Sequence, residues 1–267
     1  MKLAFSLELF LKDRPFLDRI RIAADLGYEY ADMFYIDQTS GETGPKDAAA
    51  IAKTAREAGV TITNALIDGP NGKITGGLTN PAHREAWLKR ADRTFAFCNE
   101  AEIGAVIVCT GDIVEGISHE EMRRAVIDGL KTTAEKAEAA GIDLWLEPLN
   151  DRIDHTGYFC TGSDQGAEIC RAVGSPRMKM LFDIYHMQIM EGDLAGHVER
   201  NLDVIAQFHL AGHPGRHEPW LGEINYPFLL PRIVEMGYEG VFSLEYAPTL
   251  PVEESLRRTR EYLMGNQ

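Results

Sequence analysis

Residues 181–186 read Leu-Phe-Asp-Ile-Tyr-His, an apolar run that ends in a carboxylate at Asp183. Three other apolar runs meet a polar residue in the same way: 144–146 before Glu147, 207–210 around His209, and 241–244 before Glu245. A charged group is costly inside a buried strand unless it is paired or binds a metal. Four such groups at roughly even intervals therefore predict successive strands of one barrel that deliver these side chains to one rim.

Strands and helices alternate along the chain, which is typical of a parallel sheet covered by helices. Eight segments are predicted as strands: 3–8, 30–35, 60–66, 105–110, 142–147, 178–183, 206–211 and 241–245. Eight such units favour a closed barrel over an open doubly wound sheet, as does the absence of a GxGxxG motif after the first strand. The sequence predicts an α/β fold, a single (β/α)8 barrel domain that spans residues 1–267.

Glycines just before several strands predict where helices close, because glycine tolerates the left-handed conformation of a helix C-terminus. They are Gly27, Gly59, Gly104, Gly141 and Gly237. Ser118 with Glu121 predicts a capping box at the start of a helix, and Pro251 a first helical position. The glycine turns belong to the end of the barrel opposite the predicted site.

Composition and charge narrow the classes of function. The chain has 267 residues, of which 45% are hydrophobic and 25% charged, the profile of a globular protein about as long as one barrel. Its formal net charge of −14 repels polyanions, which argues against nucleic acid as a partner. No apolar run approaches the roughly 18 residues of a membrane helix, so no membrane partner is expected.

Cysteine usage and the N-terminal segment predict a cytoplasmic protein. The cysteines are Cys98, Cys109, Cys160 and Cys170, and none of them forms a CxxC pair. Glu8 interrupts the apolar stretch 3–11, and no small-residue cleavage site follows, so the stretch is interpreted as a strand and not as a secretion signal. We therefore expect reduced thiols.

Two glutamates, one aspartate and one histidine make an oxygen-rich ligand set with a single nitrogen. Such a set suits Mn²⁺, Mg²⁺ or Co²⁺ better than structural zinc, so we expect one divalent metal ion at Glu147, Asp183, His209 and Glu245. Strand alternation turns His209 away from its apolar neighbours, which favours it as a ligand. Two alternatives stay open: Glu147 could cap its loop, and Asp183 could cap the next helix as well as bind a metal.

The pair Glu147 and Glu245 also predicts acid–base catalysis. Two carboxylates that share a metal can face opposite sides of a bound substrate, so that one removes a proton from carbon and the other returns one. A divalent cation on adjacent substrate oxygens would acidify that C–H bond. This arrangement suits isomerisation or epimerisation next to a carbonyl, through a cis-enediolate.

Substrate-binding residues are predicted near the same rim. His186 follows Asp183 by three residues. For this histidine, a role in supporting a metal ligand or contacting substrate is as well supported as a purely structural role in the core. Arg216, in the glycine- and proline-rich loop 212–219, offers five donors to a carboxylate, phosphate or polyol, with a solvated surface ion pair as the alternative. The remaining predicted contacts are Asn64, Asn150 and Glu218.

These motifs together resemble the hydroxypyruvate isomerase family, in the sugar isomerase and epimerase superfamily of xylose isomerase-like TIM barrels. The segments that carry the resemblance are LEPLN (146–150), DHTGYF (154–159), LFDIYHMQIMEGDL (181–194), FHLAGHPGRHEP (208–219) and GEINYP (222–227). The first half of the chain matches the family mainly in its alternation of strands and helices. The resemblance implies a metal-dependent isomerase or epimerase of a small sugar or hydroxy-keto acid, with the four ligands above. It also implies that the two glutamates are the acid/base pair, and that His186 and Arg216 contact substrate.

Two positions depart from that family. His209 stands where hydroxypyruvate isomerases and the related oxo-tetronate isomerase carry glutamine, and in this respect the chain resembles the ketose 3-epimerases. The chain reads Tyr246-Ala247-Pro248 where those isomerases carry Tyr-Lys-Pro. The missing lysine removes a cation that would pair with a carboxylate substrate, which favours a neutral or differently charged sugar.

Three alternatives to an isomerase or epimerase stay open. A lyase could use the same base and metal on an oxidised sugar. A phosphodiesterase of the endonuclease IV type shares the barrel but uses more metal ligands and needs a basic DNA-binding face, which the net charge of −14 disfavours. A non-catalytic binding module is the third. For the leading hypothesis the partner is a small-molecule sugar or keto acid, and a homo-oligomer is left open because relatives often pair.

Overall fold

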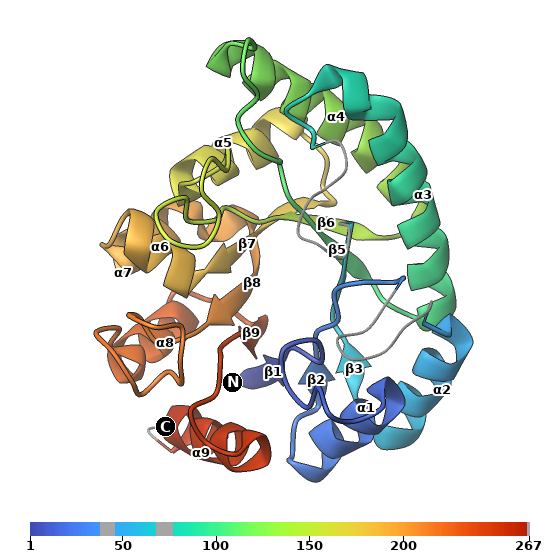
Figure 1. Cartoon of the computed structure of the whole chain (residues 1–267). Coiled ribbons are helices and arrows are strands. Elements are labelled where there is room, and N and C mark those ends of the chain that lie inside the picture. The colour runs from blue at the N-terminus through green and yellow to red at the C-terminus, as the bar shows by residue number, and fades with distance from the viewer. Residues whose placement is uncertain (38–45, 68–76, 266–267) are drawn as a thin grey trace.

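The computed structural model describes residues 1–37, 46–67 and 77–265, which form a ring of parallel strands enclosed by helices (Figure 1). The strands are β1 (Lys2–Phe5), β2 (Tyr30–Ala31), β3 (Thr61–Ile62), β4 (Ala65–Leu66), β5 (Ala105–Val108), β6 (Asp143–Leu146), β7 (Met178–Asp183), β8 (Ile205–Leu210) and β9 (Val241–Leu244). The helices are α1 (Phe16–Asp25), α2 (Ala48–Ala58), α3 (Arg84–Ala101), α4 (His119–Ala140), α5 (Ser163–Val173), α6 (Ile184–Met190), α7 (Leu194–Asn201), α8 (Tyr226–Glu235) and α9 (Val252–Met264). Short 3-10 helices lie at Pro81–His83 and Leu202–Val204.

Backbone hydrogen bonds close the ring of strands. Seven strands form a parallel sheet in the order β1-β9-β8-β7-β6-β5-β4, and β2 pairs with β3. Asp32 N donates to Phe5 O at 3.0 Å, which joins the end of β2 to β1, and Leu66 N donates to Phe34 O at 2.8 Å, which joins β4 to the segment after β2. The strands therefore close on themselves, and the predicted (β/α)8 barrel is confirmed.

Each predicted strand has a counterpart, and one of them is divided. The segment 60–66 forms β3, which pairs with β2, and then β4, which pairs with β5. Between these two strands Asn64 bonds twice to Met33: its O accepts from Met33 N at 3.1 Å, and its Nδ2 donates to Met33 O at 3.3 Å. The chain thus changes its partner strand at a polar residue that interrupts the apolar run.

Several helix ends follow the predicted signals. Gly59 and Gly141 close α2 and α4 in the left-handed conformation, at φ values of 68° and 74°. Ser118 and Glu121 form the predicted capping box, in which each side chain bonds the other residue's backbone N–H.

Two other predicted helix boundaries are displaced. Glu102, and not Gly104, closes α3 in the left-handed conformation, at φ 60°. Ile103 is buried in the core, so the chain must turn before the glycine is reached. Pro251 lies just outside α9, and the helix begins one residue later, at Val252.

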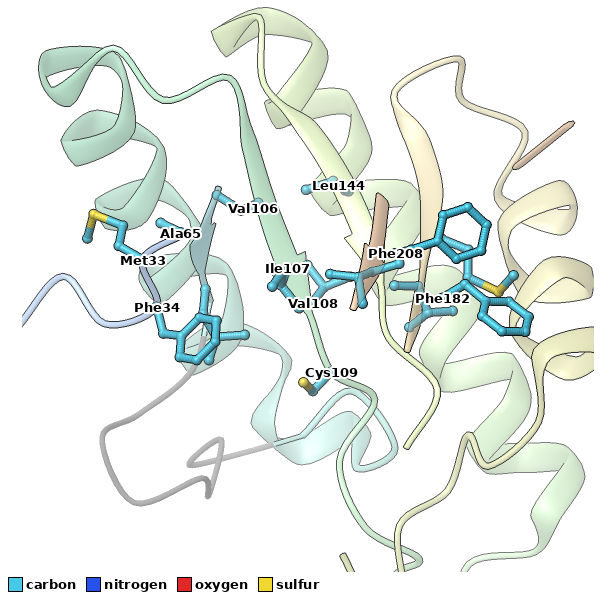
Figure 2. Close-up of a cluster of buried hydrophobic side chains, with 14 of the residues drawn as sticks. Met33, Phe34, Ala65, Val106, Ile107, Val108, Cys109, Leu144, Phe182 and Phe208 are labelled. Carbon is cyan, nitrogen blue, oxygen red and sulfur yellow. The ribbon is translucent and has the colours of Figure 1, made fainter. Parts of the chain in front are cut away.

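Side chains on β7, β8 and β9 alternate between a polar barrel interior and an aromatic layer beneath the helices. In register, Asp183 lies beside His209, while Phe182 lies beside Phe208 and Phe208 beside Phe242. The rings of Phe208 and Phe242 stack with centroids 5.3 Å apart, and Figure 2 shows Phe182 and Phe208 within one buried apolar cluster. Because the aromatic faces are buried against the helices, the alternate residues Asp183 and His209 must face the barrel interior.

The four cysteines are free and buried. Burial raises the pKa of Cys98 and of Cys170 to about 12, which keeps both thiols protonated at neutral pH. Among the helices within the described ranges, none combines the length and the apolar character needed to cross a membrane.

Candidate metal centre and active site

The four predicted ligands meet at the carboxyl ends of β6, β7, β8 and β9, which are consecutive neighbours in the sheet. Glu147, Asp183, His209 and Glu245 each offer one ligand atom, and these atoms lie within 4.8 Å of one another. Glu147 and Glu245 come directly after their strands, whereas Asp183 is the last residue of its strand. The structure therefore brings together the four side chains that were expected at one rim.

Asp183 caps α6 with one oxygen and leaves the other in the cluster. Its Oδ1 accepts from Tyr185 N at 2.8 Å and from His186 N at 3.2 Å. Its Oδ2 lies 3.6 Å from Arg216 Nη2 and 3.5 Å from His186 Nε2. Burial raises the pKa of Asp183 to about 7, against the opposing charge of Arg216. Helix cap and candidate ligand are therefore compatible functions of one carboxylate.

His209 lies among three carboxylates. Its Nδ1 is 3.1 Å from Glu245 Oε2 and 3.6 Å from Glu147 Oε1, and its Nε2 is 3.1 Å from Asp32 Oδ2. Burial alone would lower the pKa of His209, but the charge of Glu245 and the hydrogen bonds to the surrounding carboxylates raise it well above its ordinary value. The Nδ1 atom therefore favours a positive partner, either a proton or a metal ion.

Asp32, which the sequence analysis missed, holds His209 from across the barrel interior. It is fully buried after β2, and it also accepts hydrogen bonds from Gln207 Nε2 at 3.0 Å and from Thr63 Oγ1. A carboxylate on the far nitrogen of a ligating histidine fixes the ring and raises its basicity. The sequence predicted a strand over 30–35, which placed Asp32 inside the strand, whereas β2 ends at Ala31, directly before Asp32.

Arg216 places its guanidinium beside Glu245. Its Nη2 donates to Glu245 Oε2 at 2.7 Å, and the guanidinium carbon lies 5.0 Å from the centroid of the Tyr185 ring. The backbone of Arg216 is left-handed, at φ 54°, and its O accepts from Ala247 N at 2.7 Å. Burial would raise the pKa of Glu245, but the charges of Arg216 and His209 hold it far below its ordinary value. This carboxylate is therefore ionised at neutral pH.

A cavity of about 690 Å³ opens onto the cluster, within the range usual for small-molecule sites. Glu147, Glu245, His186 and Arg216 are among its lining residues. The rest of the lining includes apolar residues (Phe34, Leu66, Ile107, Val114 and Leu149) and polar residues (Asn80, His83, Asp112, Asp154 and His155). A small ligand with both polar and apolar groups would therefore find partners for each in the lining.

Three of the predicted substrate contacts lie at or directly behind this cavity. His186 and Arg216 line it, and Asn150 lies behind His186, with its backbone N 3.2 Å from His186 Nδ1. Burial lowers the pKa of His186 well below its ordinary value, so the ring is neutral. Asn64 lies deeper, fully buried beneath the cluster, where its Oδ1 accepts from Gln207 Nε2 at 3.3 Å. Asn64 therefore belongs to the hydrogen-bond network that supports His209.

Glu218 is placed elsewhere, outside the cavity lining. It is fully buried, and its carboxylate accepts from Thr249 N at 2.9 Å, from Thr249 Oγ1 at 2.9 Å and from Ser255 Oγ at 2.8 Å. The left-handed backbone of Arg216 reverses the loop, so that a residue two positions later faces the connection from β9 to α9. This placement gives no support to the predicted substrate contact, and Glu218 instead anchors the loop that carries Arg216.

The chemistry of the donor set fits a divalent cation. Three carboxylates and one imidazole nitrogen present ligand atoms within 4.8 Å of one another, on four separate strands that hold them in place. Asp32 adds a fourth carboxylate beside them, 3.1 Å from His209. Arg216 and His209 cannot neutralise this excess of negative charge, and a divalent ion offsets it.

Known proteins are similar to this chain along its whole length. The family model described as xylose isomerase-like TIM barrel matches residues 20–262. The 2-oxo-tetronate isomerase of Cupriavidus necator is 31% identical over 266 residues, which cover 98% of each protein. The hydroxypyruvate isomerase of Escherichia coli is 35% identical over 147 residues, which cover 55% of this chain and 57% of that protein.

Solved structures share the barrel. A structure described as AP endonuclease, family 2, from Brucella melitensis superposes with a TM-score of 0.87 at 26% identity, and the match covers 98% of both chains. D-psicose 3-epimerase from Clostridium cellulolyticum, solved with D-tagatose, superposes with a TM-score of 0.79 at 17% identity, covering 99% of this chain and 97% of that one, and shares the fold.

The family model spans most of the chain, and the full-length curated relatives carry the names of isomerases. Both findings agree with the resemblance that the motifs carry and with the barrel that the strands form. The chain therefore belongs to the xylose isomerase-like TIM barrel family, in its hydroxypyruvate isomerase branch, and is an isomerase or epimerase of the sugar and keto-acid class.

Proposed function

We propose that this enzyme is a divalent-metal-dependent isomerase or epimerase of a small sugar, and that Glu147 and Glu245 move the proton through a cis-enediolate. The observation that carries the proposal is that four candidate ligands lie within 4.8 Å of one another beside a cavity of substrate size. Of these four, the two glutamates also line the cavity. They are therefore the residues that reach both the ligand cluster and a bound substrate.

One divalent ion, Mn²⁺, Mg²⁺ or Co²⁺, would be held by Glu147, Asp183, His209 and Glu245. When bound, such an ion supplies a Lewis acid that stabilises negative charge on the substrate oxygens beside the reacting carbon. The protein's own contribution is to fix the ligands: α6 holds Asp183 by its first backbone N–H groups, and Asp32 holds His209.

Proton transfer falls to the two glutamates. Ionised Glu245 takes a proton from the carbon beside the carbonyl, and the electron pair of that C–H bond forms the enediolate. In an epimerisation Glu147, which starts protonated, returns its proton to the opposite face of the same carbon. In an isomerisation it returns the proton to the former carbonyl carbon, and the proton of the substrate hydroxyl group passes to the former carbonyl oxygen, so that the hydroxyl and the carbonyl change places. The reverse reaction exchanges the roles of the two glutamates. Arg216 and His186, which line the cavity, bind substrate oxygens.

The charges around the cavity favour a neutral sugar over a small carboxylate. Glu147, Glu245, Asp112 and Asp154 line it, and Arg216 is the one lysine or arginine among the described lining residues. That guanidinium is already bonded to Glu245 at 2.7 Å. A substrate carboxylate would therefore meet net repulsion, whereas hydroxyl groups can donate to the acidic lining.

Hydrogen exchange in D₂O tests the proposed function without assuming a product. Metal-stripped protein would be incubated with and without Mn²⁺, Mg²⁺ or Co²⁺ against ketoses, aldoses, hydroxypyruvate and tetronate analogues, and followed by NMR and mass spectrometry. We expect metal-dependent deuterium beside the carbonyl, or a new isomer of unchanged skeleton. A fragment or loss of water would favour a lyase, and an unlabelled, unchanged panel with metal bound would contradict the proposal.

Exchanging Asp32 for asparagine is expected to weaken Mn²⁺ binding by about 10- to 100-fold, because the far nitrogen of His209 loses its carboxylate partner. Isothermal titration measures the affinity. Asp25→Asn, on the exposed surface of α1, is the matched control and should bind Mn²⁺ as the unmodified protein does. Equal affinity in the Asp32 variant would remove this residue from the metal centre.

An endonuclease activity, for which the Brucella melitensis structure is named, has less support in this chain. The cavity lining carries four carboxylates, and the whole chain has a formal net charge of −14. A polyanionic substrate is repelled by both.

A further inference from the structure

We infer that Asn150 is a positioning residue that fixes the tautomer of His186, so that His186 offers an N–H donor to the substrate. The inference deepens the proposed function, on which it depends for the location of the substrate. It concerns which nitrogen of the His186 ring carries the hydrogen, and it rests first on a hydrogen bond from the backbone N–H of Asn150, whose direction is unambiguous.

Two donors of Asn150 converge on one nitrogen of His186. The backbone N of Asn150 lies 3.2 Å from His186 Nδ1, and its side-chain Nδ2 lies 2.6 Å from the same atom. A backbone N–H can only donate. Nδ1 must therefore accept, and an accepting ring nitrogen carries no hydrogen.

The amide orientation of Asn150 is itself fixed by its surroundings. Its Oδ1 accepts from Ile153 N at 2.9 Å and from Asp154 N at 3.0 Å, and its Nδ2 donates to Asp154 Oδ2 at 2.6 Å. Rotating the amide by half a turn would set Oδ1 against a carboxylate and the NH₂ group against two N–H donors. One hydrogen of Nδ2 is thus directed to Asp154 and the other to His186.

The hydrogen of a neutral His186 ring must then sit on Nε2. This atom is buried and has no hydrogen-bond partner among the described residues, although its side chain lines the cavity. Asp183 Oδ2 lies 3.5 Å from this atom. A buried donor without a partner is rare in folded proteins, and an oxygen of the substrate would satisfy it. His186 therefore donates to a carbonyl or hydroxyl oxygen and does not take up the carbon-bound proton.

The same network extends to Arg216, the other side chain proposed to contact the substrate. Tyr185 Oη donates to Asp154 Oδ2 at 3.0 Å, the oxygen that also accepts from Asn150. The Tyr185 ring carries the guanidinium of Arg216 on its face. One carboxylate, Asp154, thus orients the supports of both His186 and Arg216.

Long-range ¹H–¹⁵N NMR of protein labelled with ¹⁵N-histidine tests the tautomer directly. The His186→Gln variant identifies the signals of His186 by their loss. We expect Nδ1 of His186 to be unprotonated and Nε2 to be protonated in the unmodified, substrate-free protein. The opposite pattern would overturn the inference, and this measurement requires no variant of Asn150 to fold.

Asn150→Asp replaces the side-chain donor by an acceptor and should shift the hydrogen toward Nδ1. Asn225→Asp, at the N-cap of α8, is the matched control and should leave the His186 signals unchanged. Unchanged His186 signals in Asn150→Asp would overturn the role of the Asn150 side chain, because the backbone N–H of residue 150 is present in both proteins. The shift is measured on resting protein, so a failure of the proposed function would leave this result standing.

Kinetics on the substrate identified by exchange give the functional readout. Asn150→Asp is expected to lower kcat/KM by about 10- to 100-fold, the range for losing one hydrogen bond to substrate. His186→Gln, whose amide can still donate, should retain more activity than His186→Phe. Equal losses in these two variants would contradict the role of His186 as a donor.

Discussion

Turnover by the Glu245→Gln variant is expected to fall by about 10³-fold or more while the barrel stays folded. A glutamine amide cannot accept a proton from carbon, and general acid–base catalysis alone typically contributes about 10²- to 10⁴-fold. The substitution also removes a carboxylate from the ligand cluster. Steady-state kinetics measure the loss, and circular dichroism checks the fold.

Glu147→Gln should lose a similar factor, and the double variant little more than either single one, because the two residues act as one unit. Each single variant should still exchange the one substrate proton that its remaining glutamate reaches. Glu239→Gln, an exposed glutamate before β9, is the control and should keep full activity. Near-normal turnover in both single variants would exclude the two-glutamate mechanism.

Removal of the metal ion is expected to abolish turnover and to lower the melting temperature. A ligand present at 100 times its Kd stabilises the native state by about 2.7 kcal/mol. For a chain of 267 residues that corresponds to about 5 °C. Differential scanning calorimetry of chelated and metal-loaded protein measures the shift, and the return of activity with Mn²⁺, Mg²⁺ or Co²⁺ ranks the ions.

The His209→Ala variant provides the control for metal removal. It lacks the single nitrogen ligand of the cluster, so its melting temperature should hardly respond to added metal. Full turnover by protein that elemental analysis finds free of metal would contradict metal dependence. A shift of similar size in His209→Ala would place the stabilising ion at another site.

The barrel and its ligand cluster could be predicted because the signals are local and repeat. Asp183 and Glu245 break apolar runs that are long enough to recognise as strands, and parallel strands bring their ends to the same rim. Asp32 could not be recognised in this way, because the predicted strand 30–35 contains it in its interior, whereas β2 ends at Ala31. Its contact with His209 at 3.1 Å depends on the closure of the whole ring.

The loops could not be predicted, because backbone conformation decides where their side chains lie. Arg216 and Glu218 are two residues apart, yet the left-handed backbone at Arg216 sends one to the cavity and the other to Thr249 and Ser255. Asn150 was expected to contact substrate and instead bonds His186 from behind. Sequence spacing carries no information about such reversals.

The residues that line the cavity come from two portions of the chain, and the two portions have different roles. Of the described lining residues that are not candidate metal ligands, most come from the earlier portion, residues 34–114, among them Phe34, Leu66, Ile107 and Val114. The ligand cluster with its two glutamates lies between residues 147 and 245. Substitutions in the earlier portion can therefore change which substrate is accepted without touching the machinery for proton transfer. Such a division allows related enzymes to diverge in substrate specificity while they keep the same proton-transfer chemistry. It also indicates which portion of the gene to randomise when a new specificity is sought.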